Sequence, residues 1–307
     1  MKVDSHIIEL SNRDKVLFPQ DDITKGDLID YYHRMADRIL PYLEERPVML
    51  QRFPDGIAET GFYQKQVSEY FPDWITKITV GLKDRDEIRS MVVCNDAATL
   101  VYLANQACIT LHAWLSRRAS LDRPDRMIFD LDPAGDDFAG VREAARHLRE
   151  VIEDIGLAPY VMTTGSKGLH VAVPLAPGAS FDAVRDFARD LATFIVEQQP
   201  DRYTTEPRKE KRKQRLFLDY LRNGYGQTAV VPYAVRANAG APIATPLDWD
   251  ELSDGSLESN RYTMRNIFRR LGQKDDPWAR MGRHARGLAK PQKRLSALIP
   301  ARNGNAA

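Results

Sequence analysis

Residues 127–133 read Met-Ile-Phe-Asp-Leu-Asp-Pro, a short apolar strand that carries two carboxylates. Side chains alternate between the faces of a strand, so Asp130 and Asp132 point to one side while Leu131 points to the other. Carboxylates this close repel each other unless a cation lies between them, and their oxygen atoms suit Mg²⁺ or Mn²⁺. The pattern predicts a divalent-cation site at the end of a strand; the alternative is an acidic pair in a solvated turn.

Residues 160–174 read Tyr-Val-Met-Thr-Thr-Gly-Ser-Lys-Gly-Leu-His-Val-Ala-Val-Pro, which predicts a β-hairpin with small residues in its turn. The glycines allow positive φ and a close approach of the backbone to a ligand, while the hydroxyls and the lysine can bind phosphate oxygens. These turn residues are Thr164, Gly165, Ser166, Lys167 and Gly168, and His170 begins the returning strand. An ordinary hairpin with a solvated lysine is the alternative.

Residues 214–223 read Gln-Arg-Leu-Phe-Leu-Asp-Tyr-Leu-Arg-Asn, another apolar strand with one acidic residue. Burying an unpaired carboxylate is costly, so we expect Asp219 to be bound to a metal, hydrogen-bonded or paired with a cation. Arg215 and Arg222 offer a structural ion pair as the alternative. Basic residues are concentrated over 208–215, which places positive charge beside this strand, as a triphosphate or a primer backbone requires.

The three segments resemble the three motifs of the archaeo-eukaryotic primase superfamily and, more specifically, the polymerase domain of the ligase D family of prokaryotic non-homologous end joining. The likeness runs along nearly the whole chain. It includes Leu-Ser-Asn-Arg-Asp-Lys-Val-Leu-Phe-Pro at residues 10–19, Arg-Pro-Val at 46–48, Gly-Phe-Tyr-Gln-Lys at 61–65, Leu-Ala-Asn-Gln at 103–106 and Val-Pro-Tyr-Ala-Val-Arg at 231–236.

The resemblance implies a role for each matching position. It assigns two divalent ions, Mn²⁺ or Mg²⁺, to Asp130, Asp132 and Asp219, which are then the catalytic residues. It assigns the incoming nucleoside triphosphate, an NTP or dNTP, to His112, Thr164, Ser166, Lys167, His170, Arg212 and Arg236. It assigns the template side of a DNA end to Lys15 and Lys25, which grip a recessed 5′-phosphate, and to Phe62 and Tyr63, which pack on bases. Where the family usually has Ser, this chain has Thr164, which keeps the hydroxyl and adds a methyl group.

From residue 126 onward the pattern is strand, helix over 138–155, two strands joined by the hairpin turn, helix over 181–198 and a further strand. A hairpin between two helices favours an α+β fold, in which helices flank a mixed sheet of the ferredoxin-like or RNA-recognition type. It disfavours a doubly wound parallel sheet. The resemblance implies that this mixed or antiparallel sheet is a primase-like core. We expect an N-terminal α/β lobe over residues 1–121, which contacts the DNA end, packed on a catalytic lobe over 122–307 in one domain.

In the N-terminal part, Thr24 and Asp27 form a capping-box pattern that predicts a helix up to Leu43. A second helix is predicted from Asp96 to about Leu115, so that His112 lies near its end, where capping or core packing is the alternative role. Without the resemblance, the two lysines of the proposed phosphate grip would be interpreted as surface lysines. Short strands are predicted over residues 48–53, 62–67, 78–80 and 91–93.

The composition excludes several classes of protein. With 307 residues, of which 43% are hydrophobic, the chain can bury a large core, and its net charge of +1 gives no argument for DNA by itself. Cys94 and Cys108 are too few for a disulfide framework or a zinc site, and two cysteines fit a reducing cytoplasm. The resemblance implies that the protein is associated with the nucleoid there. The first residues lack the apolar core of a signal peptide, so none is expected, and no stretch approaches the roughly 20 apolar residues of a membrane span. For the basic tail over 280–302, a solvated helical end is favoured over a DNA grip.

The resemblance implies a template-directed nucleotidyltransferase that fills gaps and extends DNA ends in double-strand-break repair, prefers ribonucleotides and uses two-metal catalysis. The implied partners are DNA ends with a 5′-phosphate and a 3′ overhang or gap, nucleoside triphosphates, a Ku-type end-binding protein, and ligase and nuclease modules. No membrane is implied. The alternatives are a primase that starts chains de novo, a two-metal nuclease, and a non-catalytic module that binds or bridges DNA ends. A missing Cys/His zinc cluster disfavours the primase, and a nuclease has no need of the phosphate-binding hairpin.

Overall fold

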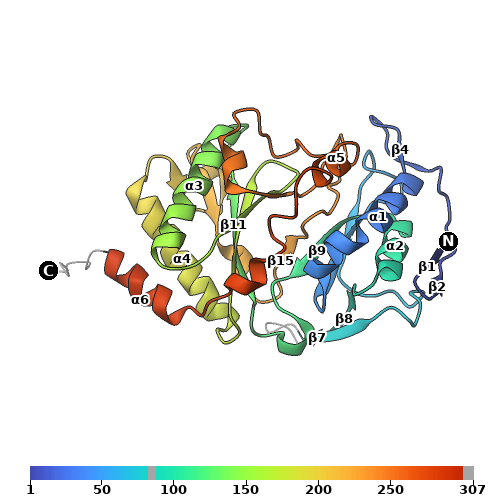
Figure 1. Ribbon diagram of the computed structural model, residues 1–307, viewed down its shortest axis with the longest axis horizontal. Helices are drawn as coiled ribbons and strands as arrows, with labels where there is room; N and C mark the ends of the chain where they lie inside the picture. Colours follow the sequence, from blue (N-terminus) through green and yellow to red (C-terminus); the bar gives the residue numbers. More distant parts are fainter. Residues whose placement is uncertain (82–87, 300–307) are drawn as a thin grey trace.

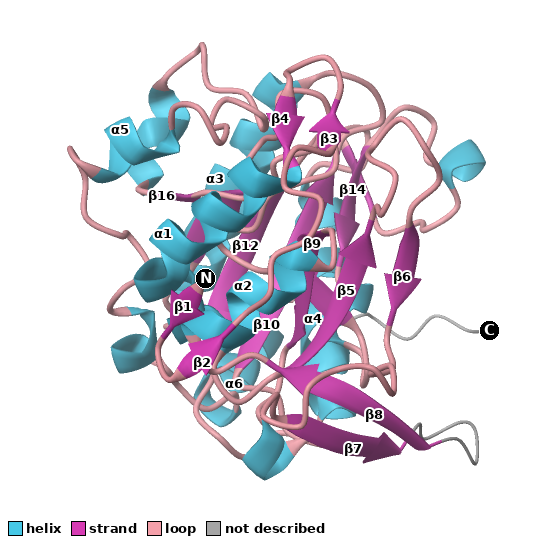
Figure 2. Cartoon of the chain, turned by 90° about the vertical axis from the view of Figure 1, so that its right-hand side faces the viewer, coloured by secondary structure: helices cyan, strands magenta, loops and turns pink. Residues whose placement is uncertain are grey.

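Two large sheets organise the chain, which the computed structural model describes over residues 1–81 and 88–299 (Figure 1). The first sheet collects strands from the N-terminal part and one strand from much later in the chain. Its described strands, in spatial order, are β15 (Thr228–Val230), β9 (Cys108–Trp114), β5 (Pro47–Arg52), β8 (Ile88–Val93) and β7 (Lys77–Gly81), with β6 (Phe62–Gln64) also paired to β5. Figure 2 shows β6 beside β5 at one side of this sheet.

The second sheet contains the three segments that the sequence analysis singled out. Its described strands, in spatial order, are β13 (Tyr203–Thr204), β14 (Leu216–Asp219), β10 (Arg126–Asp132), β12 (Leu169–Pro174), β11 (Tyr160–Thr163) and β16 (Pro246–Leu247). The pairings are antiparallel except that β13 runs parallel to β14. Two further ribbons pair β1 (Lys2–Val3) with β2 (His6–Ile7) and β3 (Val16–Phe18) with β4 (Ile23–Thr24). The predicted α+β fold with antiparallel strands is confirmed.

The helices divide between the two sheets. In Figure 1, α1 and α2 lie side by side in the half of the molecule that holds the first sheet, and α3 and α4 lie in the other half. The described α-helices are α1 (Lys25–Leu43), α2 (Ala97–Asn105), α3 (Phe138–Asp154), α4 (Phe181–Gln198), α5 (Ile267–Leu271) and α6 (Ala289–Leu298). The predicted helices over 138–155 and 181–198 are therefore confirmed. None of the described helices has the length and apolar character to cross a membrane.

Helix α1 begins where the capping pattern predicted. Thr24 Oγ1 accepts a hydrogen bond from the backbone N–H of Asp27, and the Asp27 carboxylate accepts one from the N–H of Thr24. These reciprocal bonds satisfy backbone donors that would otherwise lack a partner in the first turn. The cap also fixes where the chain leaves strand β4, and so it fixes the position of Lys25.

The predicted helix from Asp96 to Leu115 is wrong in its second half. Helix α2 ends at Asn105, Ala107 has a φ of 54°, and the chain then continues as strand β9. The reason is tertiary: β9 pairs with β5 on one side and with β15 on the other, and its β-branched and aromatic residues suit that position. His112 consequently lies inside a strand.

The two faces of strand β10 have different neighbours. Met127, Phe129 and Leu131 are buried against α3 and α4, whereas Ile128, on the opposite face, belongs to the core around the first sheet. Asp130 lies two residues after Ile128, so its side chain shares that opposite face. The alternation along one strand thus places the carboxylates where the two halves of the molecule meet.

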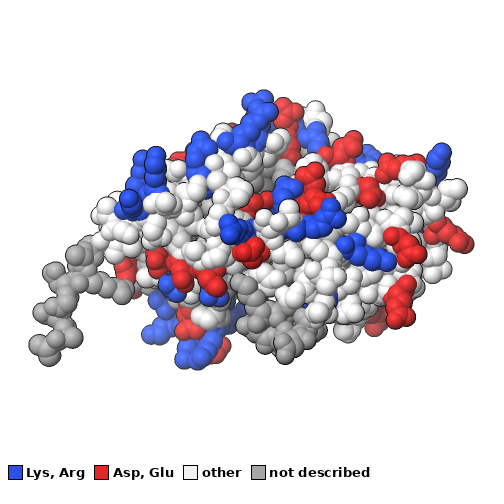
Figure 3. Space-filling model, turned by 90° about the horizontal axis from the view of Figure 1, so that it is seen from below, with Lys and Arg blue, Asp and Glu red and all other residues white. Residues whose placement is uncertain are grey.

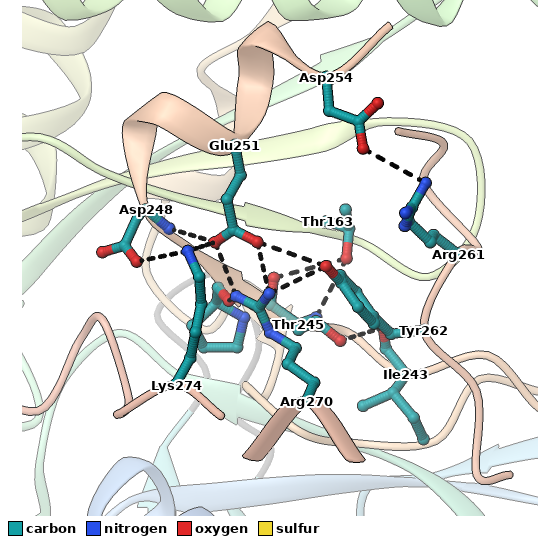
Figure 4. A network of polar contacts seen from close by, with 11 residues as sticks. Thr163, Ile243, Thr245, Asp248, Glu251, Asp254, Arg261, Tyr262, Arg270 and Lys274 are labelled. Atoms are coloured by element: carbon teal, nitrogen blue, oxygen red, sulfur yellow. Dashed lines mark hydrogen bonds and ion pairs between the residues drawn. The ribbon is translucent and has the colours of Figure 1, made fainter. Parts of the chain in front are cut away.

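The C-terminal segment is tied to the second sheet by a charged network (Figure 4). The buried guanidinium of Arg270 forms a two-point ion pair with Glu251 and donates to the carbonyl oxygen of Pro246 on β16. Lys274 Nζ contacts Asp248 Oδ2 at 3.1 Å and Glu251 Oε2 at 3.5 Å. Beyond this network, α6 is mostly exposed, as predicted for the basic tail, although its Leu295 is buried; residues 300–302 of that tail lie outside the described residues.

Candidate active site

Three neighbouring strands bring a histidine and two carboxylates into a row across the second sheet. Asp130 on β10 lies opposite His170 on β12 and opposite Asp219 on β14. Directly opposed residues of an antiparallel pair have side chains on the same face. Asp132 follows on that face of β10, opposite Phe217. The strand register therefore brings Asp219 to the two acids of β10, which lie far from it in the sequence.

The surroundings of Asp130 and Asp219 shift their pKa values in opposite directions. Burial alone would raise the pKa of Asp130, but His170 and Arg222 outweigh it and lower the pKa to about 2. His170 Nε2 lies 3.5 Å from one Asp130 oxygen, and Arg222 Nη2 lies 3.2 Å from the other. Burial and the negative charge of Asp130 raise the pKa of Asp219. Close carboxylates without a metal ion between them behave in this way.

Arginine side chains meet each of these carboxylates. Arg222 Nε lies 3.7 Å from Asp219 Oδ2, and Arg212 Nη1 donates to Asp132 Oδ2 at 3.1 Å. The structural ion pair considered for Asp219 is thus present through Arg222, whereas Arg215 donates to backbone carbonyl groups. As the side chains stand, no group of three or more His, Cys, Asp or Glu residues in 1–81 and 88–299 is close enough together to hold one ion.

One pocket of about 480 Å³ collects the acids and the predicted nucleotide contacts. Its wall includes Tyr63, His112, Asp130, Asp132, Thr164, Ser166, Lys167, His170, Arg212, Asp219, Arg222 and Arg236. Four buried nitrogens of this wall have no hydrogen-bond partner among the described residues: His112 Nε2, His170 Nδ1, Arg222 Nε and Arg236 Nε. Buried polar atoms are normally satisfied, so these atoms point to a polar ligand. Carboxylates beside cationic donors fit divalent ions together with an anionic substrate.

The predicted hairpin turn joins β11 and β12, and its two glycines have different roles. Gly165 has a positive φ of 66°, whereas Gly168 is not among the residues with positive φ. Gly168 is required by space instead, because a Cβ atom there would lie 2.0 Å from the carbonyl oxygen of Leu131. The Thr164 hydroxyl bonds to the Gly168 carbonyl at 3.1 Å and contacts Ser259 Oγ at 3.3 Å, so it holds the turn closed. Ser166 and Lys167 are exposed at its tip.

His112 and Arg236 close the pocket from the side of the first sheet. Burial, followed by the charges of Arg236 and Arg222, lowers the pKa of His112 to about 3, so its imidazole is neutral at physiological pH. The Tyr63 ring packs edge-on against it, with 6.0 Å between ring centroids. Arg236 Nη1 donates to the carbonyl of Thr164 at 3.1 Å, which joins this side of the pocket to the hairpin turn.

The residues predicted to contact DNA form two groups outside the row of acids. Lys15 and Lys25 flank the β3–β4 ribbon, and the Lys25 N–H donates to the Lys15 carbonyl at 2.8 Å. Lys15 Nζ contacts Asp55 at 2.6 Å, while Lys25 is buried, so the interpretation of Lys25 as a surface lysine was wrong. Burial and the nearby charge of Lys15 lower the pKa of Lys25. Phe62 and Tyr63 are both largely exposed on β6.

Sequence reasoning missed several contributors to this region. Arg222, considered only as a structural partner of Asp219, lies between two of the acids, and its spacing of three residues after Asp219 was the available signal. Asp136, whose Oδ1 lies 3.3 Å from Lys167 Nζ, was not identified. Ser259 Oγ donates to the Gly168 carbonyl at 2.8 Å, and no sequence pattern connects these residues, which are 91 positions apart.

Comparisons with known proteins identify the family of this chain. The family model described as "LigD, primase-polymerase domain" matches residues 24–278. The bifunctional non-homologous end joining protein LigD of Bacillus subtilis is 31% identical over 273 residues, which cover 88% of this chain and 43% of that protein. The multifunctional non-homologous end joining protein LigD of Pseudomonas aeruginosa is 32% identical over 275 residues, 89% of this chain and 32% of that protein.

A solved structure has the same fold. The polymerase domain from Mycobacterium tuberculosis ligase D in complex with DNA matches with a TM-score of 0.84 and 29% sequence identity, covering 91% of this chain and 99% of that chain. The chain spans only 32% to 43% of the length of the curated relatives named above. Since the family model and these relatives each cover most of its residues, the chain belongs to the LigD primase-polymerase domain family.

Proposed function

We propose that this chain is a template-directed nucleotidyltransferase that fills gaps and extends DNA ends during non-homologous end joining. The observation that carries the proposal is the register that sets Asp130 opposite both His170 and Asp219, on the wall of a pocket that also holds Lys167 and Arg236. Phosphoryl transfer needs carboxylates for divalent ions and cations for the phosphates within one site. This pocket offers both.

The proposed metal ligands are the three carboxylates of the pocket, Asp130, Asp132 and Asp219. Their oxygen atoms suit Mn²⁺ or Mg²⁺. Burial and ionised Asp130 raise the pKa of Asp219, and a bound divalent ion would favour the ionised form of Asp219. Bound ions, two in the family expectation, would supply Lewis acidity toward the primer hydroxyl and the leaving pyrophosphate. Arg222 contacts two of the acids here, so its side chain would have to move away from them when the ions bind.

The remaining pocket residues would bind and orient the triphosphate. Lys167 is exposed at the hairpin tip, and Arg212 and Arg236 line the same pocket, so their charges can neutralise phosphate oxygens. His112 is neutral, and its Nε2 has no hydrogen-bond partner among the described residues. It can therefore form a hydrogen bond with the substrate without adding charge. His170 would position Asp130 and contact the triphosphate, and we do not assign it as a general base.

The finer properties of the activity are proposed from the family. We expect ribonucleotides to be preferred over deoxyribonucleotides and Mn²⁺ to support the highest activity. We expect the substrate to be a DNA end with a recessed 5′-phosphate, gripped by Lys15 and Lys25 and stacked on Phe62 and Tyr63. The partners would be a Ku-type end-binding protein and the ligase and nuclease modules that complete a longer ligase D protein.

The test of the proposal is extension of a gapped, 5′-phosphorylated duplex with Mn²⁺ and labelled NTPs. The wild-type chain should extend the primer, and Asp130→Asn or Asp132→Asn should reduce the rate by at least about a thousandfold while DNA binding persists. Asp154→Asn, at an exposed carboxylate on the end of α3, is the matched control and should extend normally. Substantial synthesis by either pocket variant would remove the metal assignment.

The same reaction separates the alternatives. Chains started without a primer would indicate a primase, shortened DNA would indicate a nuclease, and a shifted band without any new product would indicate a module that only binds DNA ends. Each of these outcomes would contradict the proposed function in a different way.

A further inference from the structure

A second cavity lies at the other end of strand β10 from the proposed active site. It has a volume of about 340 Å³ and lies between the C-terminal end of α1, the start of β10 and the segment after α5. It shares no wall residue with the pocket of the carboxylates. The two cavities open on the same face of β10, because Arg126 and Asp132 are an even number of positions apart, roughly 20 Å along the strand.

Positive charge is concentrated on part of the cavity wall. Three guanidinium groups converge on one carboxylate, that of Asp125: Arg46 Nη2 at 2.5 Å, Arg117 Nε at 3.0 Å and Arg126 Nε at 3.5 Å. Arg46 is only 1% exposed, and its Nε has no hydrogen-bond partner among the described residues. Burial, followed by repulsion from Arg126, lowers the pKa of Arg46 to about 9, although Asp125 opposes this shift.

Two of the four arginines of the wall are held by several protein groups: Arg46 by Asp125 and the Trp114 carbonyl, and Arg117 by Asp125 and by Glu44 at 2.9 Å. Asp276, one of the three aspartates of the wall, accepts a hydrogen bond from the Tyr42 hydroxyl at 2.6 Å. The Arg126 side chain is 12% exposed, yet its guanidinium donates no hydrogen bond to any described residue, and neither does that of Arg38. Guanidinium donors on a cavity wall that bond to no described residue are available to an anionic ligand.

The rest of the wall is apolar and rigid. Trp278 is buried, and its indole N–H donates to the Val161 carbonyl at 3.0 Å, so its ring is fixed in position. Pro41 and Met281 complete this side. A cavity of this size is at the lower end of the range for small-molecule sites. An anionic head group on a compact apolar or planar body therefore fits both parts of the wall.

We propose that this cavity is a binding site for a phosphate monoester, separate from the polymerase pocket, in which Arg38 and Arg126 bind the phosphate and Trp278 with its apolar neighbours holds the attached group. Guanidinium forks match phosphate oxygens in geometry as well as in charge. The phosphate can belong to a free nucleotide or to the terminus of a DNA strand, and the experiment distinguishes these sources.

The experiment is calorimetric titration of the full chain with AMP, with adenosine as the probe that lacks phosphate. AMP should bind and adenosine should not, and Arg38→Gln and Arg126→Met should each weaken AMP binding by about tenfold. Arg123→Gln, at an exposed arginine just before β10, is the matched control and should bind normally. Lys167→Gln, in the polymerase pocket, should retain this binding. If Arg126→Met does not fold, Arg38→Gln decides alone, because its side chain is only half-buried.

The source of the phosphate follows from competition. Displacement of AMP by a 5′-phosphorylated oligonucleotide, but not by its unphosphorylated form, would assign the cavity to a DNA terminus; failure of both to displace AMP would assign it to a free nucleotide. The proposal is overturned if Arg38→Gln binds AMP as tightly as the wild-type chain, or if Lys167→Gln abolishes all AMP binding.

Discussion

In the proposed active site, the pKa values of single residues depend more on neighbouring groups than on residue type. Asp130 and Asp219 are the same residue type on adjacent strands, yet the pKa of Asp130 is lowered to about 2 and that of Asp219 is raised. The difference arises because His170 and Arg222 favour ionised Asp130, and ionised Asp130 then disfavours a second negative charge. A divalent metal ion bound to both carboxylates would favour both charges.

At this scale, Gly168 provides a sharp test of the site geometry. In Gly168→Ala, the new Cβ would lie 2.0 Å from the Leu131 carbonyl, so the hairpin and the strand that carries the acids must separate. We expect a loss of unfolding free energy of about 1–3 kcal/mol, measured by denaturant titration, and a large loss of primer extension. Gly135→Ala, where a Cβ meets no atom within 4 Å, should change neither measurement by much. Normal extension by Gly168→Ala would show that this contact does not hold the acids in place.

At the scale of elements, the β3–β4 ribbon explains how two distant lysines come together. Its pairing sets Val16 opposite Thr24, and the capping box then starts α1 at Lys25. Lys25 Nζ is held by Ser11 Oγ and the Asn105 carbonyl, both at 3.1 Å, whereas Lys15 Nζ pairs with the exposed Asp55. A buried lysine beside a second lysine suits an anion such as a terminal phosphate.

Replacing both lysines should therefore affect phosphorylated ends selectively. In the double variant Lys15→Ala with Lys25→Met, which keeps an apolar chain at the buried position, we expect binding to a 5′-phosphorylated overhang to weaken by on the order of tenfold. Binding to the unphosphorylated overhang should change little, as measured by fluorescence anisotropy, and Lys290→Ala on α6 serves as the control. An equal loss on both DNAs would argue against a phosphate pocket.

The network of Arg270 and Glu251 predicts a pH-dependent contribution to stability (Figure 4). Burial alone would raise the pKa of Glu251, but Arg270, the Asp248 amide and Lys274 outweigh it and lower the pKa. A lowered carboxyl pKa stabilises the fold above the unfolded value of about 4.3, and this stabilisation is lost as the pH falls through the folded value.

Glu251→Gln should accordingly cost about 3 kcal/mol of unfolding free energy at pH 7, because it leaves buried Arg270 without its carboxylate. Denaturant titrations at several pH values should show that the difference from the wild-type chain shrinks below about pH 4. Glu258→Gln, at an exposed glutamate nearby, should have little effect at any pH. A difference that stays constant from pH 7 to pH 3 would contradict the assigned charge pairing.

On the scale of the whole molecule, the chain returns to the first sheet after it has built most of the second. Strand β15 pairs with β9, the Tyr31 hydroxyl donates to the Tyr233 carbonyl at 2.7 Å, and the Val235 N–H donates to the Tyr32 hydroxyl at 3.1 Å. The boundary expected at residue 121 remains a prediction, but the first sheet does not end there. Figure 3 shows basic and acidic side chains interspersed over one face, in accord with the net charge of +1, so any DNA-binding charge is local.

The returning strand predicts that residues 1–121 will not fold alone. That fragment would expose an edge of β9 and leave two buried tyrosine hydroxyls of α1 without their contacts to residues 233 and 235. We expect its amide NMR spectrum to be poorly dispersed and its thermal unfolding to lack a cooperative transition, in contrast to the full chain. A well-dispersed spectrum of the fragment would show that the N-terminal part is an independent domain.

Local sequence was sufficient for the elements whose determinants lie within a few residues. The capping box at Thr24, the periodicity of α4 and the alternation around Asp130 and Asp132 depend on neighbours along the chain, and each was predicted near its observed position. The roles of single residues such as Lys15 and Lys25 came from family resemblance, since nothing in their local sequence distinguishes them from other lysines.

Tertiary structure decided the rest, because the deciding contacts join residues far apart in the chain. His112 lies in a strand only because β5 and β15 flank it, and Gly168 is constrained by a carbonyl on another strand rather than by its own φ. The position of Arg222 between Asp130 and Asp219, and the cluster of arginines around Asp125, depend on register and packing that local patterns do not encode.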